Sequence, residues 1–360
     1  MMSRWAEAHR DRSRKQPPRV IIPCYSDYSG GRMASTKRVG NAVHQRFDWR
    51  NQGLRYYAYN FHLRRLFGHR VQRVSVDAGF TCPNVDGTLA TGGCTFCDNR
   101  SFSPSRRLPR TAIRDQIDEG IRRLQLRYKC QHFMAYFQPA TNTYAPVDRL
   151  RDVFRQAVDH PSIMALAIGT RSDCVPDEVL DLLSELAEQT PLSVEYGMQT
   201  MHNRSLRWMN RCEEHEDTID AVERSRGRGF EIGVHIMLGL PGESLQDMLA
   251  TANEVARLKV DAVKIHNLYA VEGTPLADQV RQGTVTLMER DEYVSTLVDF
   301  LERLPESVVV ERISGEAPPR WFVGPAWAQD KPGILTAVEQ ELVRRDSWQG
   351  KYHESGGRDA

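Results

Sequence analysis

The sequence feature that most constrains the fold is an alternation of short apolar runs with stretches of helical periodicity. The apolar runs lie at 71–76, 133–137, 163–168, 192–196, 232–238 and 262–268. The helical stretches between them lie at 111–128, 147–158, 176–188, 203–208 with 217–226, and 244–258. Strands that alternate with helices predict a parallel sheet with right-handed crossovers. We therefore expect an α/β fold, a partial (β/α)6 barrel.

The two ends of the chain differ from this central pattern. Residues 1–50 mix Arg, Ser, Gly and Pro without a sustained period, which predicts a basic, disordered arm, and Met33 is a second candidate start of translation. We expect the core over 51–305. Residues 306–360 contain an apolar run at 308–313 and a helical stretch at 334–345, and we expect them to form a strand and helix extension packed on the core.

The charge of the chain is unevenly distributed. Residues 1–130 carry 25 Lys and Arg against 10 Asp and Glu, whereas the remainder carries 23 against 37. A basic half beside a reactive site is suited to binding a polyanion such as RNA. The alternative is that these arginines lie on solvated helix faces and in a disordered tail. The chain has no run of about 18 apolar residues and no secretory signal, so we expect a cytoplasmic protein without a membrane partner.

Three of the seven cysteines lie in one glycine-rich segment, 77–106, which follows the first predicted strand. Eleven residues separate Cys82 from Cys94, and two separate Cys94 from Cys97. Three thiolates are one fewer than a closed zinc site or a fully protein-ligated four-iron cluster takes. Two interpretations follow: an iron-sulfur cluster with one iron left open, or a structural zinc whose fourth ligand is Cys130, Cys174, Cys212 or a histidine.

The polar motifs of this chain resemble those of a known enzyme superfamily. DAGFTCPNVDGTLATGGCTFCDNRSFSP, AYFQPATNTYAP, GTRSDC, VEYGMQT, HIMLGLPGES and VKIHNLY are similar to motifs of the radical S-adenosylmethionine (SAM) superfamily. The resemblance covers about 56–348 and is greatest to the uncharacterised YhcC/YtqA-like branch, which is related to the catalytic subunit of Elongator. The commonest superfamily motif has three residues, not eleven, between its first two cysteines.

The resemblance implies two cofactors and their ligands. Cys82, Cys94 and Cys97 would hold one [4Fe-4S] cluster, whose open iron binds the amino and carboxylate groups of SAM. Reduction of the cluster would cleave SAM to methionine and a 5′-deoxyadenosyl radical, with an electron donor such as flavodoxin or ferredoxin as partner. Gln199 and Arg211 keep the spacing of a Gln and an Arg that contact SAM in the related oxygen-independent coproporphyrinogen dehydrogenase.

Further candidates for cofactor binding lie where predicted strands end, since the carboxyl ends of parallel strands form one face. Structural roles are the alternative for each of them, and no residue is assigned to catalysis. His235 stands where the same relative has an Asp near the ribose. Lys264 and His266 share a face of the sixth strand. We expect them either to contact a substrate inside the barrel or to be polar groups buried in the core. The other candidates are Gln138, Asn142, Arg171, Glu195 and Gly239.

These observations lead to one functional prediction and two alternatives. We expect a radical SAM enzyme of unknown substrate, with tRNA favoured because of the basic half and the resemblance to Elongator. The first alternative is a radical SAM oxidoreductase acting on a porphyrin or a small metabolite. The second is a non-catalytic protein that binds zinc or RNA.

Overall fold

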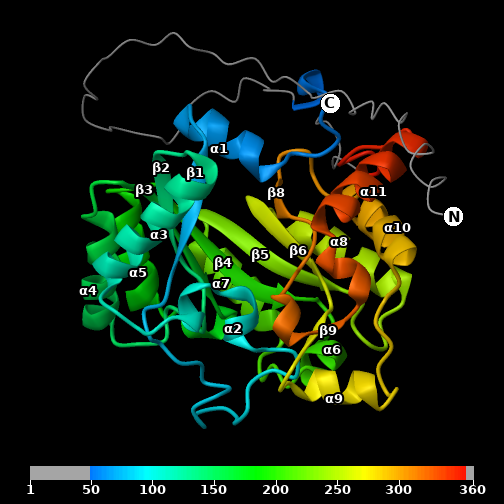
Figure 1. The fold of residues 1–360 in the computed structure, drawn as a ribbon, viewed down its shortest axis with the longest axis horizontal. Coiled ribbons are helices and arrows are strands. Elements are labelled where there is room, and N and C mark those ends of the chain that lie inside the picture. The colour runs from blue at the N-terminus through cyan, green and yellow to red at the C-terminus, as the bar shows by residue number, and fades with distance from the viewer. Residues whose placement is uncertain (1–48, 354–360) are drawn as a thin grey trace, which may run out of the picture. The chain divides into compact units, whose positions relative to one another are not determined.

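The computed structural model describes residues 49–353, and almost all of the predicted arm over 1–50, Met33 included, lies outside the described residues. A curled sheet of seven parallel strands forms the centre of the fold (Figure 1). In order across the sheet, the strands are β1 (Val71–Val76), β2 (His132–Phe137), β3 (Ile163–Thr170), β4 (Leu192–Gln199), β5 (Glu231–Leu238), β6 (Ala262–Asn267) and β8 (Val309–Arg312). The predicted α/β class and partial barrel are confirmed.

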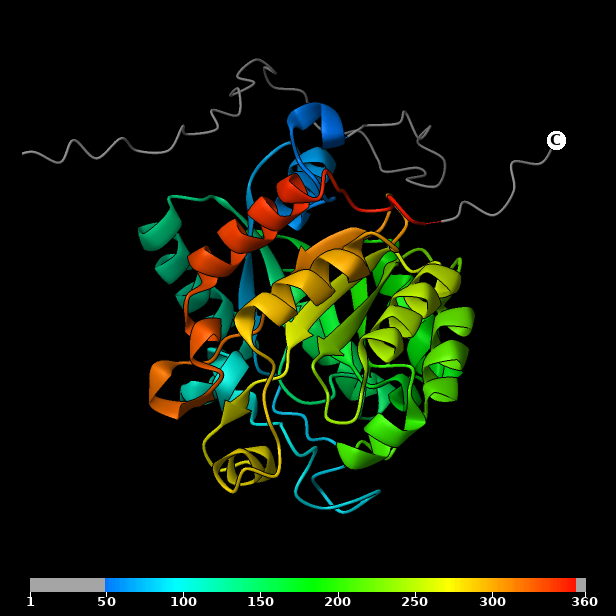
Figure 2. The same cartoon turned by 90° about the vertical axis from the view of Figure 1, so that its right-hand side faces the viewer.

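Helices connect the strands and cover the outer face of the sheet (Figures 1 and 2). The α-helices are α1 (Tyr59–Phe67), α2 (Asn99–Phe102), α3 (Ile113–Tyr128), α4 (Val147–Val158), α5 (Asp177–Ala187), α6 (Asn203–Trp208), α7 (His215–Ser225), α8 (Leu245–Leu258), α9 (Pro275–Arg281), α10 (Arg290–Leu301) and α11 (Lys331–Arg344). Short 3-10 helices are η1 (Trp49–Gln52), η2 (Ser105–Arg107), η3 (Ser172–Cys174), η4 (Pro319–Trp321) and η5 (Ala326–Gln329). Within the described residues, no helix combines the length and apolar character that a bilayer crossing requires.

The two faces of the sheet differ in chemistry, and β4 shows how. Its even-numbered residues Val194, Tyr196 and Met198 are buried in the main apolar core, on the side of α5 and α7. Because side chains alternate along a strand, Glu195 and Gln199 lie on the opposite face. Burial of the outer apolar layer therefore stabilises the sheet and leaves the inner face free for polar groups.

The half-barrel is open between its edge strands, and an ion pair spans the opening. Arg73 of β1 lies 2.5 Å from Glu311 of β8, measured from Nη2 to Oε2. Helix α1 contacts both edge strands, and its Tyr59 hydroxyl accepts a hydrogen bond from Arg73 Nε at 3.2 Å. The Arg73–Glu311 ion pair and α1 thus bridge the two edge strands where a closed barrel would have a further strand.

The strand expected at 308–313 is present as β8, and it is a full member of the main sheet, since it pairs with β6 in parallel register. Another feature of the C-terminal third was not predicted. A second sheet consists of the short strands β7 (Ala270–Val271) and β9 (Phe322–Gly324), which pair antiparallel. This small sheet places η4 and its Trp321 near the cysteine loop, as the contacts of Arg100 and Arg107 with the Trp321 ring show.

Candidate active site

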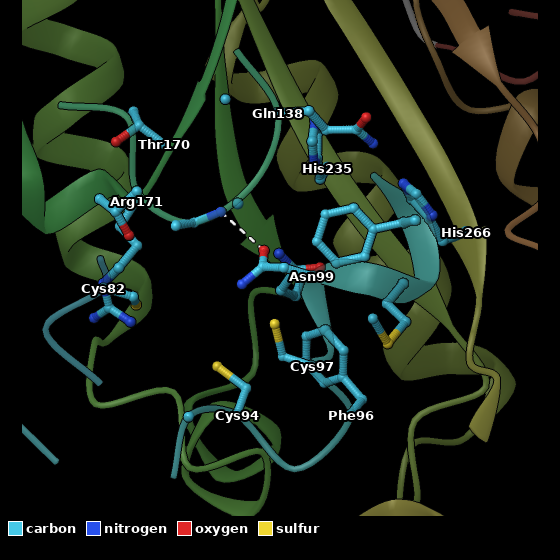
Figure 3. Close-up of a pocket in the computed structure, with 18 of the residues that line it drawn as sticks. Cys82, Cys94, Phe96, Cys97, Asn99, Gln138, Thr170, Arg171, His235 and His266 are labelled. Carbon is cyan, nitrogen blue, oxygen red and sulfur yellow. Dashed lines mark hydrogen bonds between the residues drawn. The ribbon is translucent and has the colours of Figure 1, made fainter. Parts of the chain in front are cut away.

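A cavity lies inside the curled sheet at the carboxyl ends of the strands (Figure 3). Most of the predicted site residues line it, together with Lys264 and His266. The predicted residues that line the cavity are Cys82, Cys94, Cys97, Gln138, Arg171, Gln199, Arg211 and His235. The polar motifs that follow successive strands therefore converge on one space, as the rule for parallel sheets predicts.

Hydrogen bonds to backbone groups fasten the cysteine loop to the rest of the site. Asn84 is fully buried, and its Nδ2 donates to Asn210 O at 2.5 Å and to Arg211 O at 3.0 Å. On the other side of the loop, Asn99 Oδ1 accepts from the backbone N–H of Ala140 at 2.8 Å (Figure 3). The loop position is therefore set by two asparagines that bond to segments after β2 and β4.

The three thiols share the cavity but do not converge on a single point. Sulfur ligands of one tetrahedral zinc ion lie about 3.8 Å apart. Within residues 49–353, no three His, Cys, Asp or Glu side chains form such a group. The zinc interpretation needs this convergence, whereas a cluster distributes its cysteines over separate iron atoms. Figure 3 shows the sulfur atoms of Cys94 and Cys97 pointing into the same space.

The electrostatics of the thiols also fit a cationic group. Burial raises the pKa of the Cys97 thiol, and the neighbouring Cys94 and Cys82 raise it further, while Arg211 opposes them. Deprotonation of the Cys97 thiol is therefore unfavourable unless a positive charge compensates for it. Iron bound to the sulfurs supplies such a charge, so the donor set fits the cluster that the resemblance implies.

The side chains of Gln199 and Arg211 meet over Gly197. Arg211 Nη2 donates to Gly197 O at 3.0 Å, and Arg211 Nη1 lies 3.8 Å from Cys94 Sγ. A Cβ atom at Gly197 would lie 2.6 Å from Arg211 Nη2 and 2.9 Å from Gln199 Nε2. Gln199 has a φ of 64°, and the register of β4 with β5 shifts beside it. This left-handed conformation is strained for a residue with a side chain.

A carboxylate between two arginines supports this arrangement. Glu213 Oε1 accepts from Arg211 Nε at 3.0 Å, and its Oε2 lies 3.3 Å from Arg171 Nη2. Burial raises the pKa of Glu213 to about 7, although both guanidinium groups act in the opposite direction. Arg171 Nη1 also donates to Arg211 O at 2.8 Å. Hydrogen bonds therefore hold both the side chain and the backbone carbonyl of Arg211 in place.

Three predicted residues are not among those that line the cavity. The buried Nδ2 of Asn142 donates to Phe137 O at 3.0 Å and to Gly169 O at 2.9 Å, so this side chain joins the ends of β2 and β3. Gly239, with a φ of 86°, forms the turn that follows β5. Glu195 is buried below the cavity.

Glu195 is the centre of a buried charged cluster at the floor of the cavity. It accepts hydrogen bonds from Lys264 and, at 2.6 Å, from the Tyr136 hydroxyl. His235 Nε2 lies 2.7 Å from the same carboxylate, and Arg73 Nη2 lies 3.3 Å from it. Burial lowers the pKa of His235 to about 4, and the charge of Lys264 also lowers it. His235 is therefore neutral at neutral pH and can bond to a ligand hydroxyl.

Four residues of the site were missed in the sequence. Asn84, Asn99 and Glu213 each lie two residues from a predicted ligand, namely Cys82, Cys97 and Arg211. That proximity is the signal that would have identified them, because side chains beside a ligand in a loop often hold it in place. Arg312 of β8 also lines the cavity, and no motif in its neighbourhood indicated it.

Two family descriptions match the chain. Residues 88–255 match the "Radical SAM superfamily", and residues 260–344 match the "Radical_SAM C-terminal domain". "Uncharacterized protein YtqA" of Bacillus subtilis is 39% identical over 306 residues, which cover 85% of this chain and 95% of that protein. "Protein YhcC" of Escherichia coli is 35% identical over 281 residues, which cover 78% of this chain and 90% of that protein.

More distant similarities extend to a protein named for tRNA chemistry and to a solved structure of Elp3. The tRNA uridine(34) acetyltransferase of Methanocaldococcus jannaschii is 28% identical over 158 residues, which cover 43% of this chain and 29% of that protein. The solved structure of Methanocaldococcus infernus Elp3 has a TM-score of 0.59 at 19% identity, and the match covers 78% of this chain and 64% of that chain. The Elp3 likeness shows the shared fold. The chain belongs to the radical SAM superfamily, in the branch that contains YtqA and YhcC.

Proposed function

We propose that this radical SAM enzyme modifies RNA, with tRNA as the substrate, and that a basic rim beside the cavity binds it. The rim consists of Trp321 and three arginines whose guanidinium carbons lie over its ring. The distances to the ring centroid are 5.9 Å for Arg100, 5.8 Å for Arg107 and 3.9 Å for Arg320. All three arginines are exposed. An aromatic ring among cations is a platform on which a base stacks while its phosphates are neutralised.

The rim is joined to the cavity wall through α2. Asn99 and Ser101 of this helix line the cavity, whereas Arg100 between them is exposed. Arg107 Nε donates to Arg100 O at 2.8 Å, and this hydrogen bond holds the Arg107 side chain beside the cysteine loop. An RNA segment on the rim would therefore present a nucleotide to the cavity. This juxtaposition of rim and cavity is the observation that carries the proposal.

Different residues of the site would bind the two cofactors. Cys82, Cys94 and Cys97 would ligate one [4Fe-4S] cluster, and the Arg211 guanidinium would bind the SAM carboxylate, since its fork can bond both oxygens. Gln199 would orient the same group. When bound and reduced, the cluster supplies the electron that cleaves SAM to methionine and a 5′-deoxyadenosyl radical. We further propose an electron donor such as flavodoxin or ferredoxin, and a reducing, cytoplasmic location.

The name of one similar protein supports tRNA as the substrate. It is called a tRNA uridine(34) acetyltransferase, although the match covers only part of that protein. The basic charge of residues 1–130 supports a polyanionic substrate independently. A porphyrin or small-metabolite substrate would not need the rim.

Binding of tRNA to the reconstituted enzyme tests the proposal. Fluorescence anisotropy at several salt concentrations should give an affinity that falls with salt. Trp321→Ala should weaken binding about 5- to 150-fold, the loss of about 1–3 kcal/mol for one stacked base. Arg100→Ala should reduce the salt slope by about one. Arg122, an exposed arginine of α3 paired with Glu119, is the matched control. Absence of tRNA binding, with 5′-deoxyadenosine still formed on a small metabolite, would refute the RNA proposal.

A further inference from the structure

The end of β8 departs from regular strand geometry in a way that turns two neighbouring side chains inward. Val310 pairs with Val263, but Arg312 pairs with Lys264, so Glu311 is an extra residue in the strand. Such a bulge re-aims the side chains beside it. Glu311 bonds to Arg73 below the cavity, while Arg312 lines the cavity itself.

The Arg312 guanidinium is held in place but keeps donors available. Its Nε donates to Ser314 O. A Cβ at Gly315 would lie 3.2 Å from Arg312 Nη2 and 2.6 Å from the Tyr269 ring, so only glycine allows the guanidinium and the ring to pack there. Arg312 Nη2 is buried without a hydrogen-bond partner among the described residues. Over 49–353, no carboxylate lies within ion-pair distance of it.

The cluster below the cavity does not neutralise Arg312. Arg73 and Lys264 both contact Glu195 and Glu311, so these two cations and two carboxylates balance each other. Burial lowers the pKa of the adjacent His266 imidazole, and the charge of Arg312 lowers it further. His235 is neutral for similar reasons. The deep end of the cavity therefore carries one uncompensated positive charge.

We propose that Arg312 binds a carboxylate of the substrate at this deep end, beside His235 and His266. The proposal deepens the proposed function, since it assigns the substrate nucleotide an acidic substituent. One excess charge matches a monoanion, and a planar guanidinium with free donors can bond both oxygens of a carboxylate. A buried guanidinium nitrogen without a hydrogen-bond partner, as Arg312 Nη2 is, is also costly in the free enzyme, so a ligand that bonds to it gains affinity and specificity.

This anion site is distinct from the residues proposed to bind SAM. Arg211 lies beside Cys94 and follows β4, whereas Arg312 belongs to the edge strand β8 and lies near Tyr269. Arg211 already has Glu213 as a buried partner, and Arg312 has no such partner within the described part of the chain. Two arginines on different elements can therefore bind the carboxylates of two different molecules.

Binding of small anions tests the proposal without any RNA. Isotope-labelled acetate is titrated into the enzyme reconstituted with cluster and SAM, and binding is followed by broadening of the acetate NMR signal. We expect the wild-type protein and Arg122→Gln to bind acetate, and Arg312→Gln to lose at least tenfold in affinity with unchanged iron content and SAM binding. Equal acetate affinity in wild type and Arg312→Gln would overturn the proposal. So would inorganic phosphate displacing acetate at lower concentration.

A folding defect in one variant does not make the test ambiguous. Arg312→Lys keeps the charge but lacks the fork, so we expect an intermediate acetate affinity, and thermal unfolding of both variants reports their stability. In a second experiment, tRNA from cells that lack the enzyme is treated with it, and the nucleosides are compared by mass spectrometry before and after methyl esterification. We expect the consumed nucleoside to contain a carboxyl group. A neutral consumed nucleoside would overturn the Arg312 proposal but leave the RNA function intact, whereas acetate binding without any tRNA reaction would do the reverse.

Discussion

Replacing Gly197 by alanine should weaken SAM binding while leaving the fold stable. The added Cβ would lie 2.6 Å from Arg211 Nη2 and 2.9 Å from Gln199 Nε2, both closer than real Cβ atoms approach. These atoms are the ends of flexible side chains, so they will move. The backbone of β4 stays in place, because alanine is readily accommodated in a strand and reduces the entropy of the unfolded chain.

The size of the effect follows from the contacts of Arg211. Displacement of its guanidinium breaks the 3.0 Å hydrogen bond to Gly197 O and misaligns the fork that would bind the SAM carboxylate. One hydrogen bond to a charged group contributes about 1.5–3 kcal/mol. The dissociation constant for SAM should therefore rise about 10- to 150-fold. Thermal unfolding should change by only a few degrees, because Arg211 retains Glu213 as a partner.

Equilibrium binding of SAM to the anaerobically reconstituted protein is the assay, and Gly233→Ala is the control. Gly233 is in the neighbouring strand β5 and pairs with Glu195, but its added Cβ would lie 3.5 Å from Glu195 Cγ, an ordinary contact. We expect this variant to bind SAM normally. Unchanged SAM affinity in Gly197→Ala, or the same loss in both variants, would show that the close approach of Arg211 does not position the cofactor.

Three further predictions concern the cluster loop and the floor of the cavity. Cys97→Ala should lose the cluster, seen as lost iron and visible absorbance, whereas Cys130→Ala should retain it. Asn84→Ala leaves two backbone carbonyls without their donor and should lower the free energy of unfolding by about 2–4 kcal/mol in denaturant titrations, and an unchanged value would contradict its bracing role. The pKa of His235 is lowered to about 4, so the unfolded chain binds more protons between this value and the ordinary 6.5, and stability should fall by up to about 3 kcal/mol as pH falls through this window. His235→Gln should reduce this loss of stability at low pH, and thermal unfolding at several pH values measures it.

The main sheet could be predicted from the sequence because its outer face is one continuous apolar layer. Residues such as Val194 and Tyr196 recur with strand alternation, and each strand is long enough to show it. The small sheet of β7 and β9 could not be predicted in this way. Two or three residues carry no recognisable period, and the pairing of Val271 with Phe322 depends on contacts between distant parts of the chain.

Alternation also predicted which face a side chain would occupy, but not its depth. Glu195 was expected at the cavity because it lies where the fourth predicted strand ends, and it does lie on the inner face of the sheet. It lies deeper, however, where Lys264 and Tyr136 bury it. Asn142 illustrates a different limit, since its loop has no period and nothing local indicated that its amide would bond back to β2 and β3.

Irregular strand ends explain the remaining difference between prediction and structure. Regular alternation would place Glu311 and Arg312 on opposite faces, and it would give Gln199 an extended backbone. A register shift occurs at both positions. Arg312 lines the cavity as a result, and Gln199, which alternation already places on the inner face, takes a left-handed backbone there. Shifts of this kind depend on pairing with a neighbouring strand, so a single sequence does not reveal them. In this fold the regular parts of the strands bury the core, and the bulge of β8 turns a charged group into the cavity, which is why Arg312 was missed although the cysteines, Gln199 and Arg211 were predicted.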